Sequence, residues 1–366
     1  MRQNSKIHWW YTEIGEAEKS QVLSAFDRKC FSLGRFTQEF EDRFARILGA
    51  RYAVATTSGT AAITMALLAA GIEPGDEVII PDLSWIATAN ATAILGTKVV
   101  LVDCLPDLPL IDPHEVKQKI TPHTKAIIPV HLNGRSCRMD KLLEVADGAN
   151  ITLIEDACKA LASNTPQGYL GTLGDMGCFS LGMISLVSTG YGGVVVTSDK
   201  SLRHKLILIR NQGVPKTGHE KYETMSFNFK ISDILTAIGI GQLSRLSEKL
   251  DHVHKVYQRY VDGLSSLSYI QVIAVDVASG EVPLCAEVRS GYREEIIAYL
   301  DEHGVEALRF HLPLHRAPYL RNTGDFPNAS RFAREGFILP CGPSQPMENV
   351  DRCLELLYEY GNSMGR

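Results

Sequence analysis

Residues 77–81 read Glu-Val-Ile-Ile-Pro, and three further apolar runs of this kind follow at 98–103 (KVVLVD), 125–130 (KAIIPV) and 152–156 (TLIED). Between them lie segments whose apolar residues repeat at helical spacing, at 87–95, 113–120 and 139–147. Continuous Val, Ile and Leu runs that alternate with helices are typical of a mostly parallel sheet with helices on both faces. The crossovers between such strands are expected to be right-handed. The centre of the chain therefore predicts an α/β fold.

The segments on either side extend this pattern. On the N-terminal side we expect helices at 13–26, 37–48 and 61–70, with a short strand at 52–55. On the C-terminal side we expect a strand at 194–197, helices at 232–246, 250–264, 293–303 and 347–360, and a His/Pro segment at 311–318. This order predicts a large domain of residues 1–248, with a mostly parallel sheet flanked by helices, and a smaller C-terminal α/β domain of residues 249–366.

The composition carries no nucleic-acid or membrane signature. Of the 366 residues, 45% are hydrophobic and 22% are charged, and the formal net charge is -5. No apolar run approaches the roughly 20 residues that span a bilayer, and the segment from Met1 to Lys6 lacks the apolar core of a signal peptide. We therefore expect a cytoplasmic protein with no nucleic-acid and no membrane partner. The 8 cysteines form no Cys-x-x-Cys pair, so buried reduced thiols are expected and no metal site.

A second stretch, residues 177–193, points to a family. It reads GCFSLGMISLVSTGYGG and resembles the segment GCFSFHPTKNITTGEGG of the DegT-type sugar aminotransferases, which are pyridoxal phosphate (PLP) proteins of fold type I. An ungapped count between the shared ends puts Ser185 where that family has the lysine that forms the Schiff base with PLP. The neighbours Gly182, Met183 and Ile184 also depart from the family's His-Pro-Thr. A hydroxyl cannot form a Schiff base, so the resemblance implies the scaffold without its ordinary chemistry.

One short motif, together with a serine of the segment 177–193, is a candidate for holding the phosphate group of the cofactor. The segment 57–60 (TSGT) follows a predicted strand and opens a helix, where free backbone amides attract an anion. Taken alone, this pattern also fits an ordinary capping turn. The resemblance implies that Ser58, Gly59 and Thr60 bind the PLP phosphate together with Ser180.

Two residues that follow predicted strands are candidates for contacts with the pyridine ring. Trp85 lies just past the strand at 77–81, and Asp156 ends the run at 152–156; ligands gather at this edge of open parallel sheets. From the residues alone, Trp85 also fits the core and Asp156 also fits a loop cap. In the family, the matching residues stack on the ring and bond to its nitrogen, which keeps PLP an electron sink. We therefore expect PLP, or its amine form pyridoxamine phosphate (PMP), to bind non-covalently.

The resemblance also implies a homodimer. Asn228 lies in the segment 226–230 (SFNFK) and resembles the Asn of the family's Asn-x-Arg or Asn-x-Lys turn. In the family this Asn reaches the phosphate from the partner subunit, which would place the site at the subunit interface. An amide in an ordinary surface loop is the alternative interpretation of Asn228.

Four residues are candidates for the chemistry itself. Ser185 stands at the predicted lysine position, and Lys159 stands where the family has Gln or His beside the phenolic oxygen of the cofactor. Three roles stay open for Lys159: it binds that oxygen as a cation, acts as a base, or supplies a displaced Schiff base. The last two need an amine pKa lowered by burial or by a nearby cation. His131 and His315 are further candidate bases, and structural roles fit both of them as well.

The expected function follows from these retained and lost residues. We expect lysine-independent chemistry of the ketimine, dehydration or deamination type on a keto-sugar, such as a nucleotide sugar, or on a related small carbonyl or amine substrate. The family's sugar 3-dehydratases, in which histidine replaces the lysine and PMP is held, are a precedent. Two alternatives stay open: a catalytically inactive homologue that serves as a ligand-binding or partner subunit, and PLP-independent chemistry on the same scaffold.

Overall fold

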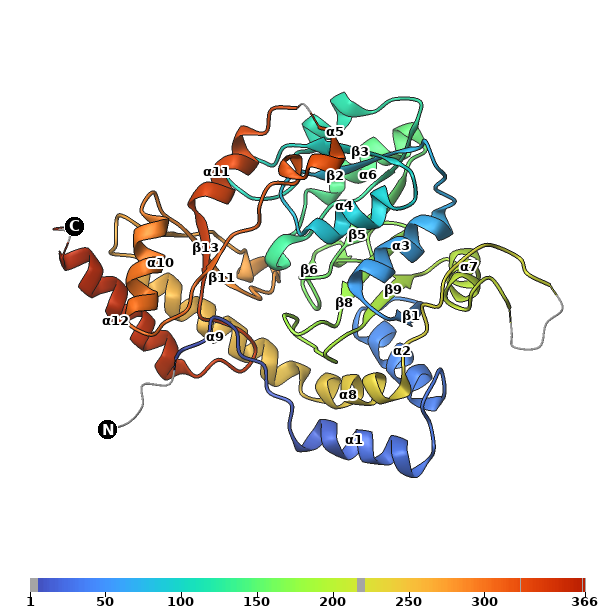
Figure 1. The fold of residues 1–366 in the computed structure, drawn as a ribbon, viewed down its shortest axis with the longest axis horizontal. Helices are drawn as coiled ribbons and strands as arrows, with labels where there is room; N and C mark the ends of the chain where they lie inside the picture. Colours follow the sequence, from blue (N-terminus) through green and yellow to red (C-terminus); the bar gives the residue numbers. More distant parts are fainter. Residues whose placement is uncertain (1–5, 216–220, 323, 364, 366) are drawn as a thin grey trace.

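The centre of the molecule is a seven-stranded sheet with the strand order β1-β9-β8-β5-β4-β2-β3 (Figure 1). The computed structural model describes residues 6–215, 221–322, 324–363 and 365, so most of the polar N-terminus discussed above lies outside it. The strands are β1 (Tyr52–Thr56), β2 (Glu77–Pro81), β3 (Lys98–Val102), β4 (Thr124–Ile127), β5 (Thr152–Asp156), β8 (Met176–Ser180) and β9 (Gly193–Thr197). All neighbours pair in parallel except β9, which runs antiparallel to β1 and to β8. The predicted mostly parallel sheet is confirmed.

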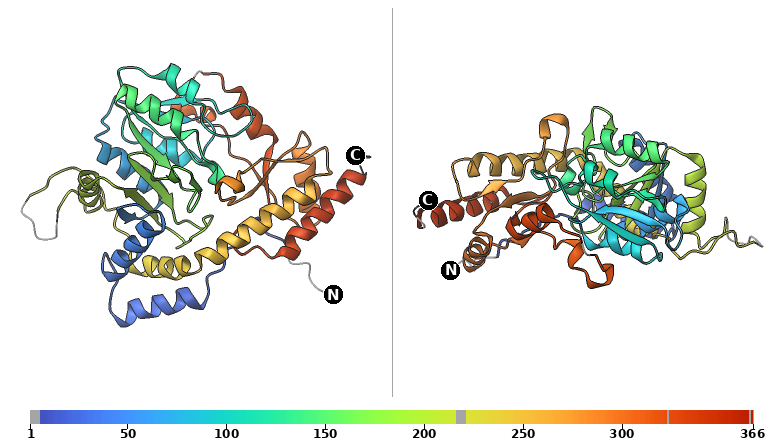
Figure 2. Two further views of the ribbon diagram at one scale, coloured as in Figure 1. Left: turned by 180° about the vertical axis from the view of Figure 1, so that it is seen from behind. Right: turned by 90° about the horizontal axis from the view of Figure 1, so that it is seen from above.

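Apolar side chains on both faces explain why these runs form central strands. Every residue of β2 and of β9 is buried, and Val78 and Ile80 of β2 lie opposite Val99 and Leu101 of β3. Helices flank this sheet (Figures 1 and 2). They are α2 (Arg35–Ile47), α3 (Gly59–Ala70), α4 (Ile86–Ala93), α5 (Pro113–Lys119), α6 (Met139–Ala149) and α7 (Lys200–Arg210). The helix α8 (Asp233–Ser244) packs on α2, and α1 (Glu16–Asp27) packs on α8. The apolar runs are thus removed from water on both sides of the sheet, which is the main stabilising effect.

A smaller antiparallel sheet forms the C-terminal part, in the order β10-β11-β13-β12. Its strands are β10 (Gln271–Val272), β11 (Ala286–Arg289), β12 (Leu308–Arg309) and β13 (Gly336–Leu339), and its helices are α9 (Leu246–Leu264), α10 (Arg293–Glu302), α11 (Pro327–Glu335) and α12 (Met347–Ser363). A short hairpin of β6 (Asn164–Thr165) and β7 (Gly168–Tyr169) stands apart. The expected boundary after residue 248 falls in the first turn of α9, which runs on without a break, and the boundary stays a prediction.

Two connections fix the C-terminal part to the rest of the chain. Ile7 and Trp10, near the N-terminal end, form isolated bridges with Val305 and Cys341. Arg135 is buried, and its guanidinium donates to the Ile273 and Ala274 carbonyls and to Glu287 of β11. The first described residues therefore pack on the C-terminal sheet, although the chain order places them in the large domain.

Two further findings concern the residues that the structure describes. Among the helices that the structure describes, none is long and apolar enough to cross a bilayer. The same residues contain no cluster of three or more His, Cys, Asp or Glu side chains with the geometry of a metal site. All cysteines are free thiols, and all but Cys30 and Cys158 are buried.

Candidate functional site

The candidate residues come together where β5 and β8 end and α3 begins. Asp156 is the last residue of β5, and Ser180 is the last residue of the neighbouring strand β8. Gly59, the first residue of α3, lies so close to this edge that a Cβ placed on it would be 3.0 Å from the Cys158 Sγ and 3.0 Å from the Ser180 Cβ. Only a residue without a side chain lets the helix start approach the two strand ends in this way.

The start of α3 has the form expected of an anion site. Ser58 is its N-cap, and the Ser58 Oγ accepts a hydrogen bond from the Ala61 backbone N–H at 3.0 Å. Thr60 is exposed in the first helical turn, and the Ser180 Oγ accepts from the Gly182 N–H at 3.2 Å. The first N–H groups and the positive end of the helix dipole favour an anion here. The structure therefore brings Ser58, Gly59 and Ser180 to one place, and their role in binding a phosphate stays a prediction.

Asp156 is buried and held by two hydrogen bonds. The Thr88 hydroxyl donates to Oδ2 at 2.7 Å, and the Cys158 backbone N–H donates to Oδ1 at 3.1 Å. Thr88 comes from α4, the helix that begins directly after Trp85. A carboxylate that is oriented in this way is well placed to accept a hydrogen bond from a protonated ring nitrogen.

Trp85 is not a core residue. Its side chain is 63% exposed, and its ring meets the His311 ring edge-on with the centroids 5.7 Å apart. The aromatic face is therefore available to a flat ligand, and the alternative interpretation as a core tryptophan is wrong. His311 was not expected in the site from the sequence.

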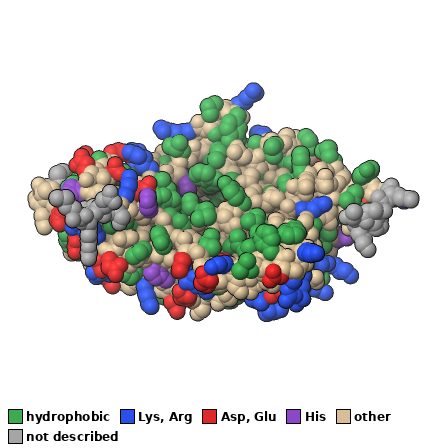
Figure 3. Space-filling model, turned by 60° about the horizontal axis from the view of Figure 1, so that its bottom comes forward, with side chains coloured by type: hydrophobic (Ala, Val, Ile, Leu, Met, Phe, Trp, Pro, Cys, Tyr) green, Lys and Arg blue, Asp and Glu red, His purple; other side chains and the backbone are tan. Residues whose placement is uncertain are grey.

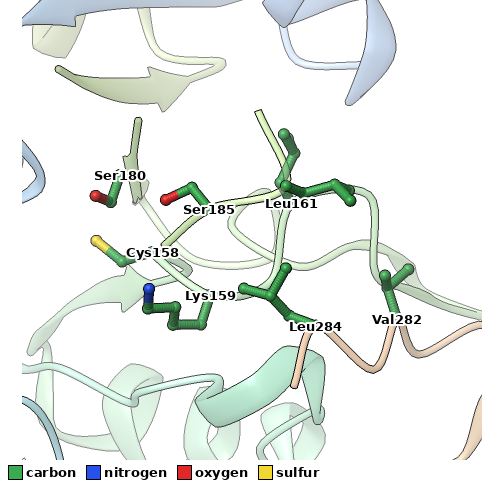
Figure 4. A pocket seen from close by; sticks show the side chains of 8 residues that line it. Cys158, Lys159, Leu161, Ser180, Ser185, Val282 and Leu284 are labelled. Carbon is green, nitrogen blue, oxygen red and sulfur yellow. The ribbon is translucent and has the colours of Figure 1, made fainter. Parts of the chain in front are cut away.

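Ser185 lines a narrow pocket between the large and small sheets. Figure 4 shows its hydroxyl, the Ser180 hydroxyl, the Cys158 thiol and the Lys159 amine on one side of this pocket, with aliphatic side chains on the other. The aliphatic lining consists of Leu161, Leu186, Val282 and Leu284. Ser185 is 3% exposed, and its Oγ has no hydrogen-bond partner among the residues that the structure describes. Because buried polar atoms are almost always hydrogen-bonded, this hydroxyl marks a place for a ligand or a water molecule.

Lys159 reaches the same segment from the end of β5. Its amine donates a hydrogen bond to the backbone carbonyl of Ile184. Burial lowers the pKa of this amine, against the opposite effect of neighbouring thiols and Asp156. Burial and the Asp156 charge raise the pKa of the Cys158 thiol, which therefore stays protonated and is a poor nucleophile. Of these two groups, Lys159 is thus the one whose unprotonated, basic form is favoured by burial.

His311 adds a second neutral nitrogen base. Burial, and then the positive charge of Lys159, lower the pKa of His311 to about 4. At neutral pH the imidazole is therefore uncharged between Trp85 and Lys159. Its place in the His/Pro segment 311–318 was a signal in the sequence, but only packing shows that His311, and not His315, lies against Trp85.

The other two candidate bases lie apart from this pocket. His131 is fully buried; its Nδ1 accepts from the Cys137 N–H at 3.2 Å, so its Nε2 carries the proton that is donated to Glu155 at 2.8 Å. His315 bonds through Nδ1 to the buried Asp82 carboxylate at 2.7 Å. His131 therefore has a partner at each ring nitrogen, and His315 has one at Nδ1. The catalytic roles suggested for them stay predictions, and nothing in the geometry favours them.

Asn228 is exposed, and its Oδ1 accepts from the Lys230 N–H of its own turn at 3.3 Å. It forms an isolated bridge with Asn211. None of the hydrogen bonds found in the described part of the chain joins it to Ser58 or Ser180. The predicted contribution of Asn228 to a partner's site is therefore untested within one chain.

The chain matches known proteins along almost its whole length. The family model of the DegT/DnrJ/EryC1/StrS aminotransferase family matches residues 12–358. A GDP-perosamine synthase of Caulobacter vibrioides is 36% identical over 349 residues, which cover 93% of this chain and 94% of that protein. The structure of S. venezuelae DesV in complex with a ketimine intermediate superposes with a TM-score of 0.92 at 29% identity, over 98% of this chain and 99% of that one. Bacillus subtilis NtdA with bound cofactor PMP has a TM-score of 0.88 at 27% identity, over 95% and 83% of the two chains.

Proposed function

Because the chain belongs to the DegT/DnrJ/EryC1/StrS aminotransferase family, we propose that it binds PLP or PMP non-covalently and acts on a nucleotide keto-sugar without a Schiff-base lysine. The observation that carries this proposal is the buried Ser185 hydroxyl, which lines a pocket with Lys159 and Ser180 yet has no partner among the described residues. A polar atom kept in this state supports a ligand that supplies the missing hydrogen bond.

The residues present fit a phosphorylated pyridine. The cradle at Gly59, which a Cβ would fill, suits a phosphate together with Ser58, Thr60 and Ser180. The exposed Trp85 face suits a flat ring, and the oriented Asp156 carboxylate suits a protonated ring nitrogen. When bound, PLP or PMP supplies an electron sink for bonds broken next to a carbonyl or amine carbon of the substrate.

Proton transfer in this proposal belongs to Lys159 and His311. Lys159 has a pKa lowered by burial, and His311 is neutral at physiological pH because its pKa is about 4. A general base must be unprotonated when it acts, and both groups meet this condition better than an exposed lysine does. Ser185 contributes a hydroxyl that can form a hydrogen bond, but a hydroxyl is a much weaker base than an amine or an imidazole. This division favours dehydration or deamination over a complete transamination cycle.

The name of the Caulobacter relative refers to a nucleotide sugar, GDP-perosamine. At 36% identity over nearly the full length, this likeness supports a nucleotide sugar as the substrate class. The NtdA structure carries PMP, and this supports the amine form of the cofactor. A cytoplasmic location belongs to the same proposal.

A homodimer is the second part of the proposal. Exposed apolar side chains follow α1 and the turn that holds Asn228: Leu23, Phe26, Phe31, Met225 and Phe227. Figure 3 shows hydrophobic side chains gathered across the middle of the face that lies beneath the view of Figure 1, where α1 is found. Exposed apolar patches of this kind are typical of interfaces. A second copy would cover them and bring Asn228 to the partner's α3.

One observation favours the alternative of an inactive homologue that serves as a partner subunit. The pocket beside Ser185 is narrow, with room for about one water molecule, and the Lys159 amine is engaged by the Ile184 carbonyl. A scaffold that has lost its reaction needs neither a wide pocket nor a free amine.

The test is cofactor capture in the protein and in a Ser185→Lys variant. The wild-type protein is expected to bind PMP or PLP, to release it on dialysis, and to show no adduct after borohydride reduction and peptide mapping. Ser185→Lys should bind PLP and yield a reduced adduct at position 185, because the new amine stands at the predicted Schiff-base position. A reduced adduct on Lys159 of the wild type would replace non-covalent binding with a displaced Schiff base. Failure of the wild type to bind either vitamer would leave the inactive-subunit alternative.

A further inference from the structure

A second lysine amine lies behind Ser185, buried in the core. Lys249 of α9 is only 1% exposed, and its Nζ donates to the Leu186 carbonyl at 3.2 Å and to the Gln242 side-chain carbonyl. Lys159 binds the Ile184 carbonyl on the other side. The backbone carbonyls of the two residues on either side of Ser185 are therefore each held by a lysine amine.

Gln242 extends this contact along the segment. Its Oε1 also accepts the Ser188 backbone N–H at 3.3 Å, and its Nε2 donates to the Glu18 carboxylate at 2.9 Å. Lys249 and Gln242 thus bind the backbone at 186 and 188, and neither residue lines the pocket beside Ser185. A shift of either contact moves Ser185, which stands one residue before Leu186.

Burying an ammonium group here is costly, and an apolar side chain of the same size would fill the space without that cost. Four charged groups act on the amine: Glu18 from α1, Glu13 from the preceding segment, Arg245 from the junction of α8 and α9, and Glu248 from α9 itself. Only Glu18 among them is both buried and opposite in charge. The lysine is therefore poorly explained by stability alone. Its contact with the Leu186 carbonyl, and its contact with the Gln242 side chain that accepts from the Ser188 N–H, point to a role in shaping the segment.

We propose that Lys249 is a positioning residue of the candidate site: it fixes residues 184–190 from behind, so that the Ser185 hydroxyl and the Lys159 amine face the same pocket. The effect on cofactor binding rests on the proposed function, whereas the effect on the segment does not. Lys249 touches neither the pocket nor, on this view, the cofactor.

Amide hydrogen exchange of the protein without cofactor tests the first effect. In Lys249→Met, exchange of the amides of residues 186–190 should rise about ten-fold or more, the change expected when one hydrogen bond from a charged group is lost. Peptides from β2 and α6 should be unchanged. The matched control is Lys255→Met on the same helix, because Lys255 is exposed; it should leave the segment as in the wild type. Unchanged exchange at 186–190 in a folded Lys249→Met protein would overturn the proposal.

Calorimetric titration with PMP tests the second effect. Lys249→Met should weaken the PMP affinity about ten-fold while the urea midpoint stays the same or rises, a combination that a purely structural role does not produce. If the wild type binds neither PMP nor PLP, the proposed function fails, and the exchange result still decides the role of Lys249. If Lys249→Met does not fold, the double variant Lys249→Met/Glu18→Gln removes both buried charges together and is compared with Glu18→Gln by the same exchange measurement.

Discussion

The amine of Lys159 donates a hydrogen bond to the carbonyl of Ile184, the residue before Ser185. A primary amine is therefore present in the pocket where the DegT resemblance predicts that one is lost, but it comes from the end of β5 and not from the segment after β8. Its position is set by a backbone acceptor, and its charge is disfavoured by burial. This arrangement suits an amine that holds or moves a proton at a fixed place.

The electrostatic link between Lys159 and His311 gives the first prediction. Lys159→Met should raise the pKa of His311 above about 4, because the positive charge of Lys159 is one of the two causes that lower it. The new pKa should stay below the ordinary value of about 6.5, because burial remains. Proton NMR titration of the histidine ring signals measures this shift. Lys255→Met is the control, and an unchanged His311 titration would show that the two groups do not interact.

Thr88 carries the second prediction, on cofactor binding. Thr88→Val keeps the shape of the side chain but removes the hydroxyl that donates to the Asp156 Oδ2. Loss of a hydrogen bond to a charged group costs about 1.5–3 kcal/mol, so the affinity for PMP should weaken by roughly ten-fold or more. Isothermal titration calorimetry measures it.

Thr92→Val is the matched control for this change. Thr92 lies one turn later in α4, is buried, and donates to the Thr88 carbonyl without touching Asp156. If both variants weaken PMP binding equally, α4 packing and not the orientation of Asp156 is responsible.

The third prediction concerns the close approach of α3 to the strand ends. Gly59→Ala places a Cβ 3.0 Å from the Cys158 Sγ and from the Ser180 Cβ, and such overpacking costs about 1–3 kcal/mol. Gly148→Ala in α6 meets no atom within 4 Å and should stabilise the protein by up to about 1 kcal/mol. Urea unfolding of both variants measures the contrast. A Gly59→Ala protein as stable as Gly148→Ala would mean that α3 does not lie this close.

Much of the central sheet could be predicted from the sequence because its strands are buried on both faces. The run 194–197 predicts β9 (Gly193–Thr197) to within one residue, and the pattern at 347–360 predicts most of α12 (Met347–Ser363). The strands of the C-terminal sheet gave no such signal. β12, Leu308–Arg309, consists of two exposed residues, which are too few for a period of two to be recognised.

The residues of the candidate site also fall into two groups: those that the sequence could identify and those that only the structure shows. Asp156 was identifiable because it ends an apolar run, and ligands gather where neighbouring parallel strands end. Ser180 was identifiable only through the resemblance of the segment 177–193 to the DegT family. Thr88, His311 and Lys249 were not, because each acts on a residue far away in the sequence. The Thr88 hydroxyl meets Asp156, which is 68 positions along the chain, and no local pattern in α4 marks that contact.

The fourth prediction tests the joint between the two sheets. Arg135 and Glu287 form a buried ion pair at 2.5 Å, and Arg135 also binds the Ile273 and Ala274 carbonyls. Arg135→Met should destabilise the protein by about 3–5 kcal/mol, because Glu287 is left buried without its partner. Arg259→Met breaks an exposed pair with Asp351 and should cost at most about 1 kcal/mol. Equal losses in urea unfolding would contradict a joint that depends on the buried pair.

The last prediction is the pH dependence of stability that Lys249 introduces. Burial, followed by the charge of Arg245, lowers the pKa of Lys249 to about 8, although Glu18 opposes the shift. In the unfolded chain the pKa returns to about 10.4. Between these values the unfolded chain holds a proton that the folded protein has released, so the free energy of unfolding must rise with pH through this window. Below pH 8 both states are protonated, and the full cost of burying the charge is present.

The comparison with Lys249→Met isolates this contribution, since the other titrating groups are common to both proteins. The wild type should gain stability relative to the variant between about pH 8 and pH 10.4, by up to about 3 kcal/mol at roughly 1.4 kcal/mol for each pH unit. Urea unfolding at intervals across this range measures the difference, and Lys255→Met should show none. If the difference in unfolding free energy between the wild type and Lys249→Met does not change with pH, Lys249 keeps its proton in the folded protein. The amine would then bind the Leu186 carbonyl as a full cation throughout the range.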